Sequence, residues 1–152
     1  MEITFIAGIH GVGKTYYMKS LNDNIPSYSA SDLIRKYKNI EGKKTEKIGE
    51  NQNLLLDAIS DLKEKEIYLD GHFCLLNKNE EITRIPINVF KELKLKRIIL
   101  IHASIEKIIE RLHQRDSQRY DKKLLEKFQQ EEIEYGKEIA KELNIKLQLI
   151  EN

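Results

Sequence analysis

The chain has 152 residues, of which 40% are hydrophobic and 34% are charged, and its formal net charge is +1. This length provides one domain with a hydrophobic core but not two, and the small net charge argues against a general nucleic-acid-binding protein. A single cysteine, Cys74, excludes an intramolecular disulfide, and no stretch approaches the ~20 apolar residues that cross a membrane. The first residues lack the basic and apolar regions of a signal peptide, so we expect a cytoplasmic protein.

The first half of the chain alternates short apolar runs with amphipathic segments, which predicts strands separated by helices. Strands are expected at residues 3–7, 26–30 and 67–69, and helices at 15–21, 31–37 and 48–65. Ser31 and Asp32 are favourable N-cap residues, and the polar stretch 38–47, which contains Gly42, predicts a loop.

The second half continues this alternation after a predicted hairpin with strands at 73–76 and 82–85. Pro86 favours the first turn of a helix that ends near residue 93. There follow a strand at 97–101, a helix N-capped by Ser104, a long helix at 122–143 and a strand at 145–150. The pattern predicts a single α/β domain over residues 1–152, with a parallel sheet covered by helices on both faces.

The segment GIHGVGKT, from Gly8 to Thr15, matches the phosphate-binding pattern G-x-x-x-x-G-K-[ST] without a mismatch. It lies between an apolar strand and a helix start, where the glycines let backbone N–H groups surround a phosphate. Lys14 would neutralise the β- and γ-phosphates of ATP, and the Thr15 hydroxyl would bind Mg²⁺. The predicted ATP-binding residues are Gly8, Gly11, Val12, Gly13, Lys14, Thr15 and Tyr16.

A carboxylate follows the third predicted strand. Asp70 ends the apolar run 67–69, which we expect beside the phosphate-binding strand. At that edge of the sheet, the carboxylate would complete a Mg²⁺ site with Thr15. Asp70 and Gly71 also form a common turn dipeptide, so a purely structural role stays open.

Two groups of arginines stand out by their helical spacing. Arg35 lies three residues after Asp32 and shares a helix face with it. Arg111, Arg115 and Arg119 are spaced by four residues and would form one helical stripe. Arginine donors suit the equatorial oxygens of a transferring phosphoryl group, whereas helix capping and a solvated surface are the alternative interpretations.

Four motifs, GIHGVGKT, SDLIR, YLDGH and RDSQR, occur in the order and spacing of adenylate kinase-like nucleoside monophosphate kinases. The chain most resembles the archaeal type, and the resemblance covers nearly its whole length. It implies a three-layer P-loop NTPase sandwich with five parallel strands in the order 2-3-1-4-5. It also implies a monophosphate-binding segment at about 31–64 and a short lid at about 113–121.

The resemblance also implies roles for individual residues. The acceptor-binding residues would be Ser31, Asp32, Arg35 and His72, the metal ligands Thr15 and Asp70, and the catalytic residues Lys14, Arg111, Arg115 and Arg119. Arg111 departs from the family spacing by one residue. Tyr16 and Tyr17 replace smaller residues and the acceptor segment is short, so the identity of the acceptor stays open. His72 is either an acceptor contact or a turn residue.

A monophosphate acceptor is ionised at neutral pH and needs no base, whereas a hydroxyl acceptor needs one, for which Asp32 is the candidate. The sequence therefore predicts Mg²⁺- and ATP-dependent transfer to a nucleoside monophosphate, with AMP as the first choice. The alternatives are a kinase acting on a nucleoside or nucleic-acid hydroxyl, and an ATP-dependent switch or assembly factor with weak ATPase activity. The predicted partners are small-molecule nucleotides and not membranes or extended nucleic acids; the oligomeric state is not predicted.

Overall fold

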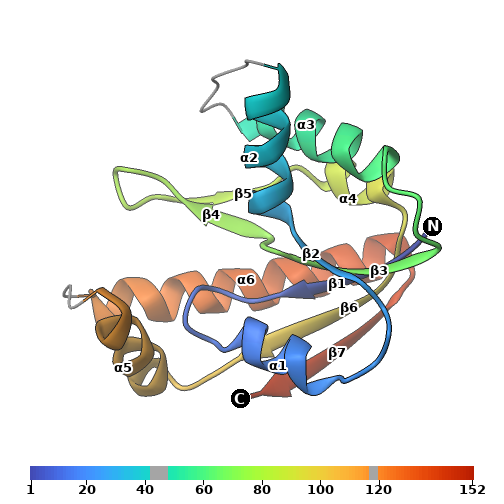
Figure 1. The fold of residues 1–152 in the computed structure, drawn as a ribbon. Helices are drawn as coiled ribbons and strands as arrows, with labels where there is room; N and C mark the ends of the chain where they lie inside the picture. The colour runs from blue at the N-terminus through green and yellow to red at the C-terminus, as the bar shows by residue number, and fades with distance from the viewer. Residues whose placement is uncertain (42–47, 117–119) are drawn as a thin grey trace.

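Five parallel strands form the central sheet of the computed structural model, which describes residues 1–41, 48–116 and 120–152. The strands are β1 (Glu2–Ala7), β2 (Ser27–Ser29), β3 (Glu66–Gly71), β6 (Leu95–His102) and β7 (Lys146–Glu151). Their spatial order is β2-β3-β1-β6-β7 (Figure 1). This is the predicted order 2-3-1-4-5 once the separate hairpin of β4 (Cys74–Leu76) and β5 (Ile82–Arg84) is left out of the count.

Helices cover both faces of this sheet, as predicted. They are α1 (Lys14–Ser20), α2 (Ala30–Glu41), α3 (Ile48–Ser60), α4 (Ile87–Leu93), α5 (Ile105–Asp116) and α6 (Lys122–Leu143). In Figure 1, α6 runs along one face and α1 lies on the other, while α2 and α3 pack together above the sheet. In the described part of the chain, no helix is both long and apolar enough to cross a bilayer.

The core lies around the central strand β1, in which every residue from Ile3 to Ala7 is buried. A parallel strand covered on both faces needs such a continuous apolar run, because neither face meets water. The rings of Phe5, Phe73 and Phe90 pack against one another, with centroids 5.1–5.6 Å apart. Cys74 is buried, as expected for a small apolar residue, and burial raises the pKa of its thiol to about 12.

Several predicted boundaries are corrected by the structure. The prediction that Ser31 or Asp32 caps the second helix is wrong: α2 begins at Ala30, and the Ser29 hydroxyl accepts a hydrogen bond from the Asp32 N–H at 3.3 Å. This helix continues to Glu41, beyond the predicted start of a loop at residue 38, while α3 ends at Ser60 and not near residue 65. The predicted hairpin and the helix at 122–143 are confirmed.

The structure describes two of the three arginines of the predicted stripe. Arg111 and Arg115 lie on α5, which ends at Asp116, and α6 begins at Lys122. Asp121 starts that second helix, since its carboxylate accepts hydrogen bonds from the backbone N–H groups of Lys123 and Leu124. Arg119 and the centre of the predicted lid, 117–119, lie outside the described residues.

Candidate active site

The phosphate-binding loop connects β1 to α1 and depends on its glycines. The backbone φ angles of Gly8, Gly11 and Gly13 are 149°, 92° and 90°. A Cβ atom on Gly8 would lie 2.5 Å from the Ile101 carbonyl oxygen, and one on Gly13 would lie 2.2 Å from Asn152 Nδ2. Only glycine combines these positive angles with such close approach, so the predicted loop has the backbone shape that a phosphate cradle requires.

Lys14 lies at the centre of the site, buried at the start of α1. Its Nζ atom donates to the Gly8 carbonyl at 2.8 Å and the Gly71 carbonyl at 3.2 Å, and lies 3.1 Å from Asp70 Oδ1 and 3.3 Å from His72 Nδ1. Burial lowers the pKa of Lys14, and the neighbouring Asp70 carboxylate opposes this effect. The structure therefore brings together three predicted site residues, Lys14, Asp70 and His72.

This convergence follows from the pairing of β1 with β3. Ala7 lies opposite Gly71 in the parallel register, so the ends of both strands meet at one edge of the sheet. Thr15 and Asp70 line the same cavity there. A hydroxyl and a carboxylate are the oxygen donors that Mg²⁺ prefers, usually together with substrate phosphates. The described residues contain no group of three or more His, Cys, Asp or Glu side chains that could hold a metal.

Arg111 has a contact that its spacing did not predict. Its guanidinium donates to the Gly11 carbonyl at 3.1 Å and to the Asn152 carbonyl at 3.2 Å. The Asn152 side chain in turn donates to the carbonyl of Val12, a buried loop residue, at 2.8 Å. Arg111 thus connects the phosphate-binding loop to the residue after β7. Arg115, one helical turn further, is exposed and also lines the cavity.

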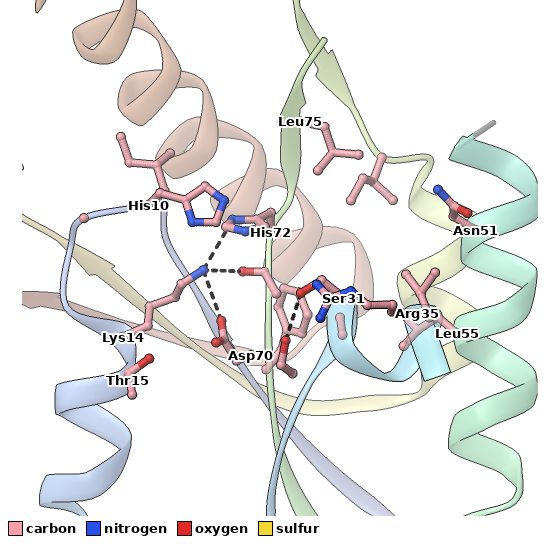
Figure 2. Close-up of a pocket in the computed structure, with 18 of the residues that line it drawn as sticks. His10, Lys14, Thr15, Ser31, Arg35, Asn51, Leu55, Asp70, His72 and Leu75 are labelled. Carbon is pink, nitrogen blue, oxygen red and sulfur yellow. Dashed lines mark hydrogen bonds and ion pairs between the residues drawn. The ribbon is translucent and has the colours of Figure 1, made fainter. Parts of the chain in front are cut away.

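The cavity has a volume of about 760 Å³ and extends from the loop to α2 and α3. Figure 2 shows Lys14 and Thr15 on one side, Asn51 and Leu55 on the other, and Ser31 and Arg35 between them. The exposed Tyr16 also contributes to its wall. Among the predicted acceptor residues that the structure describes, Ser31, Arg35 and His72 line this cavity.

Asp32, by contrast, is not among the described residues that line the cavity. Its carboxylate forms an ion pair with Arg35 Nη1 at 3.1 Å, and both side chains are 70% exposed. The predicted common face of the helix therefore exists, but only its arginine contributes to the cavity wall.

Glu132 is a buried carboxylate that sequence reasoning missed. It is 0% exposed, and its Oε1 atom accepts hydrogen bonds from the backbone N–H groups of Phe73 at 2.8 Å and Cys74 at 2.7 Å. Its Oε2 atom lies 3.8 Å from His72 Nδ1 and has no hydrogen bond to a described residue. The sequence feature that could have identified Glu132 is its position as a charged residue on the apolar face of α6, between Phe128 and Tyr135.

His10 is an exposed residue that also lines the cavity and packs against His72, with ring centroids 4.9 Å apart. Partial burial of this ring lowers the pKa of His10 to about 4, and electrostatic interactions with His72, Lys14 and Arg115 add to the effect. The His10 side chain is therefore neutral near pH 7, so it adds no charge to an anion site.

Comparison with known proteins assigns the family. An AAA domain family model matches residues 7–129, which include the phosphate-binding loop, Asp70 and Arg115. The chain belongs to this AAA domain family. No curated protein sequence matches it.

Two solved structures share the fold. TT1252 from Thermus thermophilus is 14% identical, with a TM-score of 0.55 over 100% of this chain and 88% of that one. A gluconokinase from Sinorhizobium meliloti 1021 is 16% identical, with a TM-score of 0.53 over 99% of this chain and 81% of that one. Together with the phosphate-binding loop, these likenesses identify the predicted three-layer P-loop NTPase fold.

Proposed function

We propose that this protein transfers the γ-phosphoryl group of ATP to a nucleoside monophosphate, with AMP as the first candidate. The supporting observation is the excess of positively charged side chains in the wall of the cavity that extends from the phosphate-binding loop to α2 and α3. The described cationic residues that line it are Lys14, Arg35, Lys38, Arg111 and Arg115. The one carboxylate among the described lining residues is Asp70. Such a surface suits two phosphate-bearing ligands that approach each other.

The position of the carboxylates favours an anionic acceptor. Asp70 lies against Lys14, and the exposed Asp32 does not line the cavity. In the described part of the wall near α2, no carboxylate is therefore available to deprotonate a hydroxyl group. A monophosphate is already ionised at neutral pH and needs no such base.

In the proposed reaction, an acceptor phosphate oxygen bonds to the γ-phosphorus as the bond to the β–γ bridging oxygen breaks, and ADP leaves. Lys14 exchanges its contacts at the strand ends for the ATP phosphates, while Arg35 and Ser31 bind the acceptor phosphate. Thr15 and Asp70 would hold Mg²⁺, which supplies positive charge beside the β- and γ-phosphates when bound. Arg115 and Arg119 would stabilise charge on the transferring group, and His72 would contact the acceptor.

The Asp32→Asn variant tests the choice of acceptor. Because we assign no proton transfer to Asp32, its kcat should stay within about threefold of the wild-type value from pH 6 to 9. A general base would lose about 10²- to 10⁴-fold in kcat on this change. The assay is ADP release at saturating ATP with nucleoside monophosphates, nucleosides, gluconate and 5′-hydroxyl oligonucleotides. Turnover confined to hydroxyl acceptors, or ATP hydrolysis with none of them, would refute the proposal.

The Arg35→Ala variant tests the binding site for the acceptor phosphate. Loss of a charged hydrogen-bond donor should raise the KM for the monophosphate roughly tenfold to a hundredfold. The KM for ATP should change much less, because Arg35 lies between Lys14 and α3 and not beside the loop (Figure 2). Lys36→Ala is the matched control, since this neighbouring cation is exposed and is not among the described lining residues. Equal changes for both substrates would assign Arg35 a structural role.

A further inference from the structure

Two residues far along the chain hold the backbone of the phosphate-binding loop. The Asn152 side chain donates from Nδ2 to the Val12 carbonyl at 2.8 Å. The Arg111 guanidinium donates to the Gly11 carbonyl at 3.1 Å and to the Asn152 carbonyl at 3.2 Å. Because Gly11 and Val12 are adjacent in the chain, these three hydrogen bonds form a closed ring. The proposed reaction assigns no step to either Arg111 or Asn152.

Both residues of this ring are themselves fixed by the sheet and by α5. The backbone N–H of Asn152 donates to the His102 carbonyl at 2.8 Å, which extends the pairing of β7 with β6 by one residue. On α5, Ile108 and Leu112 lie against the loop so closely that a Cβ atom on Gly11 would be 3.0 Å from Ile108 Cγ2 and 3.1 Å from Leu112 Cγ. The loop is therefore held by two packed elements and not by its own residues alone.

The captured carbonyls determine where the loop N–H groups point. The peptide bond between Val12 and Gly13 is trans, so its N–H points opposite to its C=O. Asn152 binds that C=O, so the Gly13 N–H points away from Asn152, and Gly13 lines the cavity. Glycine at positive φ rotates at little cost, so a released peptide group could turn its carbonyl toward the cavity. A carbonyl oxygen there would repel the phosphate that the N–H group attracts.

We propose that Asn152 and Arg111 position the phosphate-binding loop by holding two of its carbonyls away from the ATP phosphates. Arg111 then has a positioning role in place of the catalytic role that the family resemblance implied. The inference rests on the proposed function only in that it takes the loop to bind ATP, and it does not depend on the acceptor. Loop N–H groups bind the phosphates both before and during transfer, so loss of the ring should weaken ATP binding and spare the chemical step.

Equilibrium binding of ATP and of inorganic tripolyphosphate, measured by calorimetry, tests the role of Asn152. Asn152→Ala and Asn152→Leu should each weaken the binding of both probes by about three- to tenfold. Leucine is uncharged and similar in size to asparagine but cannot donate, so it excludes a simple loss of packing. Gln148→Ala is the matched control, because Gln148 is an exposed amide on β7 and should bind both probes as the wild type does. Wild-type affinities in both Asn152 variants, or a loss for ATP alone, which would place Asn152 at the base or ribose, overturn the inference.

Arg111→Ala separates positioning from catalysis. It should raise the KM for ATP while kcat stays within about threefold of the wild type and the KM for the acceptor is unchanged, whereas loss of a contact made only in the transition state would lower kcat. In Arg111→Ala/Asn152→Ala, the loss of ATP affinity should be smaller than the product of the two single losses, because each change breaks the same ring. Independent losses, or a fall in kcat for Arg111→Ala, overturn the inference. If no nucleoside monophosphate accepts the phosphoryl group, the proposed function alone fails, and the binding measurements still decide the role of the ring.

Discussion

The Lys14→Ala variant is expected to lose phosphoryl transfer by about 10³-fold or more while it keeps the wild-type fold. Lys14 is the buried cation of the site, and its Nζ atom contacts two strand-end carbonyls and the Asp70 carboxylate. Lys14, Asp70 and Gly71 line the cavity, so removal of the Lys14 side chain leaves a space that water can fill. Transfer is measured as ADP and nucleoside diphosphate formation, and folding by circular dichroism.

Lys19→Ala provides the control for this prediction. Lys19 is an exposed lysine in the last turn of the same helix, α1, and does not line the cavity among the described residues. Its loss should leave the transfer rate near the wild-type value. Wild-type turnover in a folded Lys14→Ala protein would remove the basis for assigning phosphate binding to this loop.

Replacing Glu132 by alanine is expected to cause a large loss of stability, about 3 kcal/mol in the free energy of unfolding. The Oε1 atom of this residue accepts from the backbone N–H groups of Phe73 and Cys74, and both residues are fully buried. Each buried donor left unpaired costs about 1–3 kcal/mol. For a domain of this size, the midpoint of thermal unfolding should fall by about 6–12 °C.

Two further variants separate the causes of this loss. Glu132→Gln keeps an oxygen acceptor for both N–H groups and should recover most of the stability. Glu134→Ala removes an exposed glutamate from the same helix and should change the free energy of unfolding by less than about 0.5 kcal/mol. Because His72 directly precedes Phe73 and lies near Glu132 Oε2, Glu132→Ala should also raise the KM for the acceptor. A stability like that of Glu134→Ala would contradict the assigned role of Glu132.

The amino-acid sequence by itself determined the features that depend on neighbours along the chain. The segment from Gly8 to Thr15 predicted the phosphate-binding loop, because its turn needs glycines at positive φ. The apolar spacing of 122–143 predicted α6 with its observed bounds. Alternation of these local patterns was enough to predict a parallel sheet with helices on both faces, whereas the strand order was implied by the resemblance to adenylate kinase-like proteins.

Only the tertiary structure decided what the individual side chains contact. The sequence grouped Arg111 with Arg115. In the structure, Arg111 donates to the carbonyl of Gly11 in the loop and to the carbonyl of Asn152, the residue after β7. Pairing of β1 with β3 brings Lys14 to Asp70. Contacts of this kind join residues 40 or more positions apart, and Glu132 lies 59 positions from Phe73. Such partners depend on how whole elements pack against one another. The hydrophobic periodicity of a helix or strand predicts which of its faces is buried, but not which residues that face contacts.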